Sequence, residues 1–411
     1  MRLSNSPDLD STIEAVTQAV SDINHQLADR QAGLVALSHE VFEDSEIRFQ
    51  EHRSSARVAA HLEKEGFEVN RGTGGMPTAF RAERAIGTGG PSLAIFCEYD
   101  ALPEIGHACG HNVIATAGAG AAAAVASQLE AEGTPCRVIV LGSPAEEGGG
   151  GKVKLIQAGQ LDGVDAAIMV HPAGFDAEYK ANLGRVALEV AFTGRAAHAA
   201  ATPDEGRNAL DGAALFLTAI GLLRQQLRSS SRIHAIIVEG GGAVNVIPER
   251  ARLSVFARSP ERSYLYERLL PALSDCAQGA ALATGTTVEW KEVEPAYEPV
   301  AANPVLSELA TAALDALGRS AAQSHPKGDS AGSTDMGNVS QVVPALHPYV
   351  CVVPGVATHT REFAAAARSE AGDRAAIDGA ALLGAIALTL AREPTVLAEV
   401  RRTFEEAQRE G

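Results

Sequence analysis

The sequence predicts an α/β protein with a mixed, mostly parallel sheet, helices on both faces of that sheet, and an inserted α+β domain. Its 411 residues exceed the size at which one hydrophobic core usually stops growing. Short continuous apolar runs are separated by stretches of helical spacing, which is typical of buried parallel strands. Beyond residue 184 the apolar residues come closer to alternation, as in a sheet with one face in water.

The first domain begins with two expected helices, at 11–38 and 53–65, where apolar residues recur at helical spacing. Gly66 ends the second before an extended stretch at 67–70. Helical spacing returns at 303–318 and 371–392, so this domain resumes after the insertion. Its central strands are expected at the apolar runs 93–97, 138–141, 166–170 and 349–353.

The inserted domain is expected to combine strands with two helices. We place it at 184–298, which leaves 1–183 and 299–411 as a discontinuous first domain. Its strands are expected at 186–192, 234–238, 252–257 and 286–290, and its helices at 206–228 and 261–283.

Composition excludes several classes of partner. The formal net charge of −17 makes attraction to nucleic acid or to anionic membranes unfavourable. Five cysteines without paired spacing argue against a secreted disulfide framework and favour the reducing cytosol. The start of the chain lacks an apolar signal segment, and the weakly polar run 113–126 is typical of a packed core helix. We expect a cytoplasmic protein that binds neither nucleic acid nor membranes.

Polar clusters follow the expected strands, at the sheet edge where open α/β sheets bind ligands. Cys109 and His111 lie on a glycine-broken loop before a helix, and thiolate and imidazole are good ligands for zinc-like ions. The alternative is a buried cysteine beside a helix-capping histidine.

Three more strand ends carry metal-ligating or proton-transferring residues. Glu146 and Glu147 are adjacent, so on an extended segment one can bind metal while the other faces substrate. His171 and His359 follow two further strands. Taken alone, the two glutamates could form an acidic turn, and each histidine could be structural. Together with the Cys109–His111 loop, however, these strand ends offer about five metal ligands. That number is enough for two ions that share a bridging water.

Two segments carry a family resemblance, Glu98-Tyr99-Asp100-Ala101-Leu102-Pro103 and His107-Ala108-Cys109-Gly110-His111-Asn112. Over almost its full length the chain resembles the co-catalytic metallopeptidases that include aminoacylase, glutamate carboxypeptidase and succinyl-diaminopimelate desuccinylase. The two segments are similar to the amidohydrolase branch, which contains aminobenzoyl-glutamate hydrolase and aminoacylase-like dipeptidases.

The resemblance implies Glu146 as general base and acid, and Asp100 as the residue that orients the site. One departure concerns Glu98, because much of the wider family has a metal-binding histidine two residues before the aspartate. In the amidohydrolase branch, Cys109 and His111 replace that histidine. The implied metal ligands are Cys109, His111, Glu147, His171 and His359.

The resemblance also implies that the inserted domain is a lid and a dimerisation domain. His198 lies in a segment similar to the family's transition-state histidine motif, although a histidine at a strand end can also be structural. Asn245 and Arg258 resemble lid residues that hold a substrate carboxylate, and Gly332 and Ser333 resemble the substrate-side loop. Without the resemblance, Arg258 would be read as a surface charge and the Gly332–Ser333 loop as a turn. A homodimer is implied, in which His198 completes the partner's site.

The expected reaction is hydrolysis of an amide bond beside a free carboxylate, in a dipeptide, an N-acyl amino acid or aminobenzoyl-glutamate. Paired divalent ions, either zinc or manganese, cobalt or nickel, bind a water molecule that Glu146 deprotonates. His198 polarises the carbonyl, and Asn245 and Arg258 hold the carboxylate. Two alternatives remain open at this point: a metal-dependent aminopeptidase and a catalytically silent binding relative.

Overall fold

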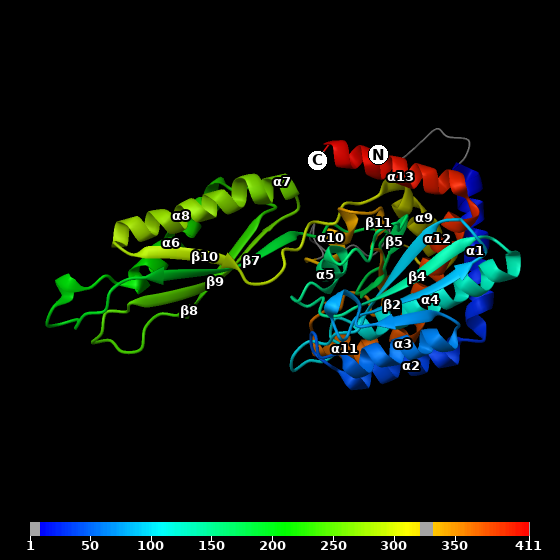
Figure 1. Cartoon of the computed structure of the whole chain (residues 1–411), viewed down its shortest axis with the longest axis horizontal. Helices are drawn as coiled ribbons and strands as arrows, with labels where there is room; N and C mark the ends of the chain where they lie inside the picture. The colour runs from blue at the N-terminus through cyan, green and yellow to red at the C-terminus, as the bar shows by residue number, and fades with distance from the viewer. Residues whose placement is uncertain (1–8, 321–331, 411) are drawn as a thin grey trace. The chain divides into compact units, whose positions relative to one another are not determined.

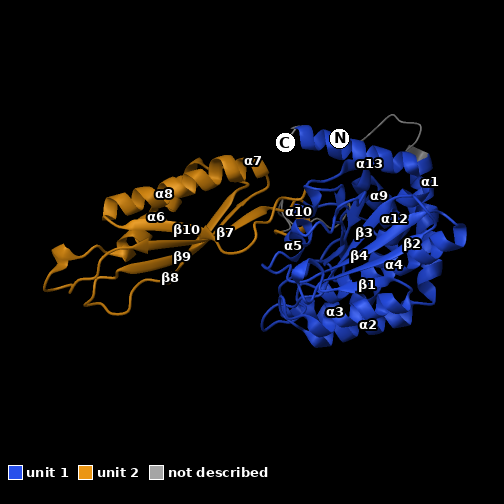
Figure 2. Cartoon of the chain, in the orientation of Figure 1, with its two compact units in different colours: residues 1–180, 301–330, 338–411 blue, residues 181–300, 331–337 orange. Residues whose placement is uncertain are grey.

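The computed structural model describes residues 9–320 and 332–410, and it divides into two compact units (Figure 2). Unit 1 comprises Met1–Lys180, Ala301–Ser330 and Asn338–Gly411. Unit 2 comprises Ala181–Val300 and Ala331–Gly337. Each unit has its own cluster of buried apolar side chains.

Unit 1 is built on a six-stranded sheet in the order β1-β2-β4-β3-β5-β11. The pairs β4–β3, β3–β5 and β5–β11 are parallel, whereas β1–β2 and β2–β4 are antiparallel. The mixed, mostly parallel sheet predicted from the apolar runs is therefore confirmed. Its strands are β1 (Glu68–Arg71), β2 (Phe80–Ile86), β3 (Ser92–Glu98), β4 (Cys136–Ser143), β5 (Ala166–Ile168) and β11 (Ala345–Leu346).

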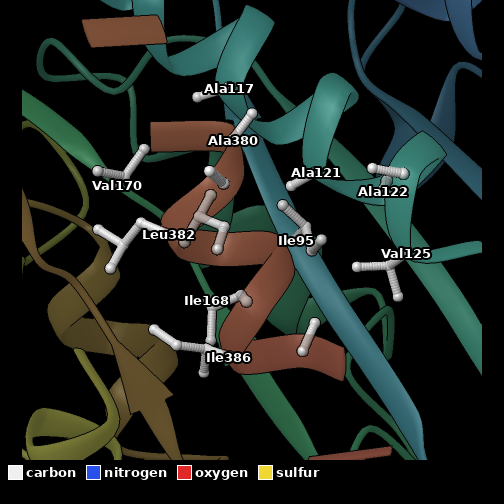
Figure 3. Packing of buried hydrophobic residues seen from close by; sticks show 14 of the residues in the cluster. Ile95, Ala117, Ala121, Ala122, Val125, Ile168, Val170, Ala380, Leu382 and Ile386 are labelled. Atoms are coloured by element: carbon white, nitrogen blue, oxygen red, sulfur yellow. The ribbon is translucent and has the colours of Figure 1, made fainter. Parts of the chain in front are cut away.

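The core of unit 1 is centred on two long helices, α4 and α12, which lie side by side (Figure 1). Side chains of α12 such as Leu382 and Ile386 pack near Ile95 of β3 and Ile168 of β5 (Figure 3). Alanine and glycine on α4 permit close approach: a Cβ at Gly118 would lie 2.6 Å from Cys97 Sγ. The helices of unit 1 are α1 (Leu9–Ala28), α2 (Gln31–Asp44), α3 (His52–Lys64), α4 (His111–Glu132), α5 (Gly151–Gln157), α9 (Pro304–Ala316), α11 (Arg361–Ala367), α12 (Glu370–Arg392) and α13 (Pro394–Glu410). The short helix α10 (Met336–Ser340) begins in unit 2 and ends in unit 1.

Both α4 and α12 are long and apolar enough to cross a membrane by length and composition alone. In each helix, however, the most apolar window is 89% or 83% buried inside the protein. The apolar character of these two helices is therefore accounted for by the core of unit 1, and neither is a clear membrane span.

Two expectations about unit 1 need correction. The stretch 11–38 is not one helix, because the chain turns at Asp29–Arg30 and separates α1 from α2. The apolar run at 349–353 is not a central strand of the large sheet. Instead β12 (Tyr349–Cys351) pairs in parallel with β6 (His171–Ala173) in a separate two-stranded sheet, and β11 takes the place beside β5.

Unit 2 contains a four-stranded antiparallel sheet in the order β10-β7-β9-β8. Helices α6 and α8 cover one face of this sheet (Figure 1), and Phe192 and Phe216 pack between the layers. The elements are β7 (Gly184–Thr193), α6 (Ala209–Leu223), β8 (Arg232–Glu239), β9 (Arg250–Ser259), α8 (Leu270–Thr284) and β10 (Thr287–Glu292), with a short π-helical segment at Leu265–Leu269 before α8.

Candidate metal centre

The candidate metal centre lies at the carboxyl ends of the strands of unit 1. Cys109 ends a loop after β3, and His111 begins α4. Gly110 joins them with φ at 77°, and a Cβ there would lie 2.6 Å from Pro172 Cγ. Only glycine fits this position without strain, because the conformation is left-handed and the neighbouring chain is close. The glycine thus allows Cys109 and His111 to face one site.

Asp100 links the two sides of the centre. Its Oδ1 is 3.0 Å from His111 Nδ1, and its Oδ2 accepts a hydrogen bond of 3.0 Å from the backbone N–H of Glu147. Burial would raise the pKa of Asp100, but the charge and hydrogen bond of His111 outweigh it and the pKa is lowered. An ionised Asp100 directs Nδ1–H of His111 toward itself and leaves Nε2 to face the centre.

Two groups of three potential ligands share Cys109. The ligand atoms of Cys109, His111 and His171 lie within 4.8 Å of one another, and so do those of Cys109, Glu147 and His359. Cys109 Sγ is 3.5 Å from His171 Nε2, and His359 Nε2 is 3.0 Å from Glu147 Oε1. The structure therefore brings together all five residues predicted as ligands, in an arrangement suited to two cations on either side of one thiolate.

His359 reaches the centre from a strained loop. It is one of the non-glycine residues with positive φ in the described chain, at 63°. Its backbone N–H donates a 2.8 Å hydrogen bond to the carbonyl oxygen of Ala108, next to Cys109. Strained backbone of this kind persists where the surroundings hold it, often at functional sites.

Burial shifts the pKa values of the buried donors in different directions. Burial raises the pKa of the Cys109 thiol well above its ordinary value, and the charge of Glu147 adds to this effect. Burial lowers the pKa of His171 to about 4, so its imidazole is neutral and able to bind a metal. His111 Nε2 is buried and makes no hydrogen bond within the described chain. Thiolate, imidazole and carboxylate together form a donor set that zinc-like ions prefer.

Glu146 lies beside Glu147 in the turn after β4 and is 7% exposed. Its carboxylate belongs to a third group of close donor atoms, with Glu98 and His111. Glu147 instead faces His359, whose hydrogen bond and charge, together with the charge of His111, lower its pKa against the opposing effect of burial. The adjacent carboxylates thus have different surroundings.

The other predicted site residues belong to unit 2. His198 and Asn245 lie on neighbouring segments, because Ala199 N–H donates to the carbonyl oxygen of Asn245 at 3.0 Å. His198 Nδ1 accepts hydrogen bonds of 3.2 Å from the backbone N–H groups of Ala200 and Ala201. Its Nε2 therefore carries the proton in the neutral ring.

Arg258, at the end of β9, is half-buried over the ring of Phe256, and its Nε makes no hydrogen bond within the described chain. Burial, with the charge of the cross-strand neighbour Arg185, lowers its pKa. Gly332 is exposed and accepts a 2.7 Å hydrogen bond from Leu183 N–H, while Ser333 is half-buried.

A comparison with protein families identifies the family to which this chain belongs. The model of peptidase family M20/M25/M40 matches residues 97–377, which span Asp100, Glu146 and every potential ligand in the two groups. The chain belongs to this family. As a member it is a metal-dependent hydrolase of amide or peptide bonds.

The chain is also similar in sequence to two individual proteins. The chain is 39% identical to the Xaa-Arg dipeptidase of Mus musculus over 90% of its own length and 88% of the relative. It is 36% identical to one of the proteins that form the p-aminobenzoyl-glutamate hydrolase of Escherichia coli, over 68% of this chain and 59% of that protein.

Two solved structures share the fold. A dinuclear metal-binding peptidase of the M20 family from Bacillus subtilis aligns with a TM-score of 0.66 and 22% identity, covering 87% of this chain and 98% of that one. An aminobenzoyl-glutamate utilization protein from Klebsiella pneumoniae aligns with a TM-score of 0.67 and 20% identity, covering 89% and 98%.

Two buried residues beside the candidate metal centre were not predicted from the sequence. Lys152 is completely buried and pairs with Glu98, although a lysine in the first turn of a short helix usually lies in water. Glu51 is also buried, and its Oε1 accepts hydrogen bonds from the N–H groups of Phe49 and Ala145. Only the position of Glu98, two residues before Asp100, gave a signal in the sequence.

Proposed function

We propose that unit 1 holds two divalent ions, one between Cys109, His111 and His171 and the other between Cys109, Glu147 and His359. The observation that carries this proposal is the membership of Cys109 in both groups of close donor atoms. Zinc is the ion that the sulfur and nitrogen donors favour, and manganese, cobalt and nickel are alternatives.

The reaction we propose is hydrolysis of the amide bond of a dipeptide or N-acyl amino acid with a free carboxylate. When bound, the two ions would lower the pKa of a water molecule and polarise the scissile carbonyl. Glu146 would accept a proton from that water and later give it to the leaving amine. Asp100 holds His111 in the tautomer that leaves Nε2 free for a cation.

Residues of unit 2 would bind substrate. With Nδ1 of His198 occupied by backbone N–H groups, its Nε2–H is available to donate to the carbonyl oxygen as charge develops there. Arg258 and Asn245 would hold the carboxylate of the leaving amino acid, and Gly332 and Ser333 would border the substrate. A guanidinium can bind a carboxylate through two parallel hydrogen bonds, which fixes orientation as well as position.

The printed names of two relatives support a substrate class. The mouse protein, at 39% identity, is named a dipeptidase for Xaa-Arg, and a second relative is named for aminobenzoyl-glutamate. We propose short dipeptides as the first class to test, with arginine as the leaving residue, and aminobenzoyl-glutamate as the second.

A substrate panel on the metal-reconstituted enzyme tests this proposal. Dipeptides with a free carboxylate, N-acyl amino acids and aminobenzoyl-glutamate form one arm, and amino-acid amides and anilides form the other. Metal-dependent hydrolysis of the substrates in the first arm would support the proposal. Preferential cleavage of amides or anilides with a free amine would instead indicate an aminopeptidase.

We further propose a homodimer joined through unit 2 in the cytosol. Strand β8 lies at the edge of its sheet, where its backbone can pair with another strand. Ile236 and Val238 on β8 are 64% and 49% exposed, and Leu222 on α6 is 62% exposed. An apolar edge of this kind is a surface suited to a second copy. All five cysteines are free, which supports the proposal of a reducing compartment.

A further inference from the structure

A buried ion pair borders the candidate metal centre. Glu98 ends β3 and Lys152 lies in the first turn of α5, and both side chains are 0% exposed. Lys152 Nζ donates a hydrogen bond to Glu98 Oε1 and lies 5.6 Å from the centre of the Phe96 ring. Removing two charges from water is costly, and a close contact between them only partly offsets that cost. A pair in this position therefore calls for a function.

The second oxygen of Glu98 points to that function. Glu98 Oε2 is buried and makes no hydrogen bond with any described residue. It lies 3.5 Å from His111 Nε2, the ring atom that Asp100 leaves free for a metal. Two donor atoms bound to the same zinc-like ion at about 2.0–2.1 Å lie roughly this far apart.

The surroundings favour a cation rather than a chance approach. Donor atoms of Glu98, His111 and Glu146 lie within 4.8 Å of one another, and all three residues are buried. A buried carboxylate oxygen and a buried ring nitrogen that both lack a hydrogen bond within the described chain are each unfavourable. A single cation between them would satisfy both atoms.

We propose that Glu98 is an additional ligand of the ion between Cys109, His111 and His171, and that Lys152 is the positioning residue that holds Glu98 for this role. The inference rests on the two-ion site proposed above. Lys152 fixes one oxygen of the carboxylate and balances its charge, while the other oxygen faces the ion.

The consequence is an asymmetric pair of sites. The ion on the His171 side has four protein donors, which fills a tetrahedral shell, whereas the ion on the His359 side has three. The His171 side should therefore bind its ion more tightly than the His359 side.

Cobalt titration of the metal-depleted, full-length enzyme tests the proposal. The wild type should bind two Co²⁺ ions with unequal affinity and with sulfur-to-cobalt charge-transfer absorption from Cys109. Glu98→Gln should weaken the tighter ion by about 100-fold or more, above the usual effect of residues that only orient ligands. Lys152→Met should weaken it by about 10-fold. Glu51→Gln is the matched control, a buried carboxylate outside the three donor groups, and should leave both affinities unchanged.

The double variant Glu98→Gln/Lys152→Met guards against misfolding, because it leaves no unpaired buried charge. It should match the wild type in circular dichroism and in metal-free melting temperature, yet still lose the tighter ion. Two ions bound by the folded double variant with wild-type affinity would overturn the proposal while leaving the two-ion site intact. A wild type that binds no Co²⁺ through sulfur would overturn both.

Discussion

At the scale of single residues, the adjacent carboxylates of Glu146 and Glu147 have separate partners. Glu147 faces His359 and Glu146 lies near Glu98 and His111. Because Glu146 is proposed to move protons and not to be one of the five ligands, Glu146→Gln should lower kcat by at least about 100-fold, the size of a general acid–base effect. Its metal content should stay near that of the wild type.

Metal analysis of the purified variants checks this division of roles. Glu147→Ala should lose one ion, so it provides the positive control for metal loss. Equal metal loss in Glu146→Gln would contradict the assignment of Glu146 as the proton carrier.

Cys109 should make metal binding depend on pH. Burial lowers the pKa of His111, but the charges of Asp100 and Cys109 outweigh it and raise the pKa well above its ordinary value. Together with the neutral thiol of Cys109, this means that ions displace protons, so affinity should rise as pH rises. Calorimetry in buffers of different ionisation enthalpy should find roughly two protons released near pH 7. Binding without proton release would exclude thiolate ligation.

Glu51 should make the metal-free protein less stable as pH rises. Burial, together with the charge of Asp100, raises the pKa of Glu51 to about 7 from 4.5. A raised carboxyl pKa means that the native state holds the proton more tightly, so its stabilising effect is complete below about pH 4.5 and is lost by about pH 7. The whole effect is about 3 kcal/mol.

Glu51→Gln keeps the amide oxygen as an acceptor but cannot ionise, so its stability relative to wild type should increase between pH 5 and pH 8. Urea unfolding of both proteins across this range measures the difference. Glu14→Gln, on an exposed face of α1, is the control and should show none. A constant offset for Glu51→Gln at every pH would contradict the raised pKa.

At the scale of elements, a row of three arginines crosses the sheet of unit 2. Arg258 on β9 pairs with Arg185 on β7 and Arg232 on β8. Arg258→Ala should lower kcat/KM about 10- to 100-fold for substrates with a free carboxylate, mainly through KM. The corresponding amides should be little affected, because they lack the charge that Arg258 binds.

Steady-state kinetics on a matched dipeptide and dipeptide amide measures this difference. Arg232→Ala removes an exposed arginine from the same row and should change neither substrate. An equal loss for the acid and the amide would argue against a carboxylate-binding role.

Some strands and helices could be predicted from the sequence pattern, and others could not. The runs at 93–97 and 138–141 are buried from both sides, so continuous apolar residues predicted β3 and β4. Strand β12 lies in a similar continuous apolar run, but its pairing with β6 depends on tertiary contacts that a local sequence pattern does not predict. The amphipathic helix α13 was not predicted, because its charged face resembles a solvated tail.

The candidate site was predictable to a similar extent. Cys109, His111 and Glu147 lie in motifs whose spacing marks them, and the structure brings them together. Lys152 was missed because its burial depends on how α5 packs beside β3 and β4, and a lysine beside glycines resembles a surface turn. Sequence spacing therefore identifies donors better than it identifies the residues that hold them.

At the scale of the whole molecule, the proposed dimer makes a prediction about shared sites. If His198 of one protomer completes the partner's site, mixing Glu146→Ala with His198→Ala protomers should restore one intact site per heterodimer. Activity should reappear from two nearly inactive proteins after co-expression. A purified heterodimer without activity, or a fully active monomer, would reject this arrangement.

The central claim is a pair of ions that share the thiolate of Cys109, and anomalous X-ray diffraction from zinc- or cobalt-loaded crystals tests it most directly. We predict two anomalous peaks roughly 3.5–4 Å apart, with Cys109 Sγ in contact with both. His111 and His171 should bind one ion, and Glu147 and His359 the other. A single fully occupied peak, or two peaks without Cys109 as a shared ligand, would contradict the account.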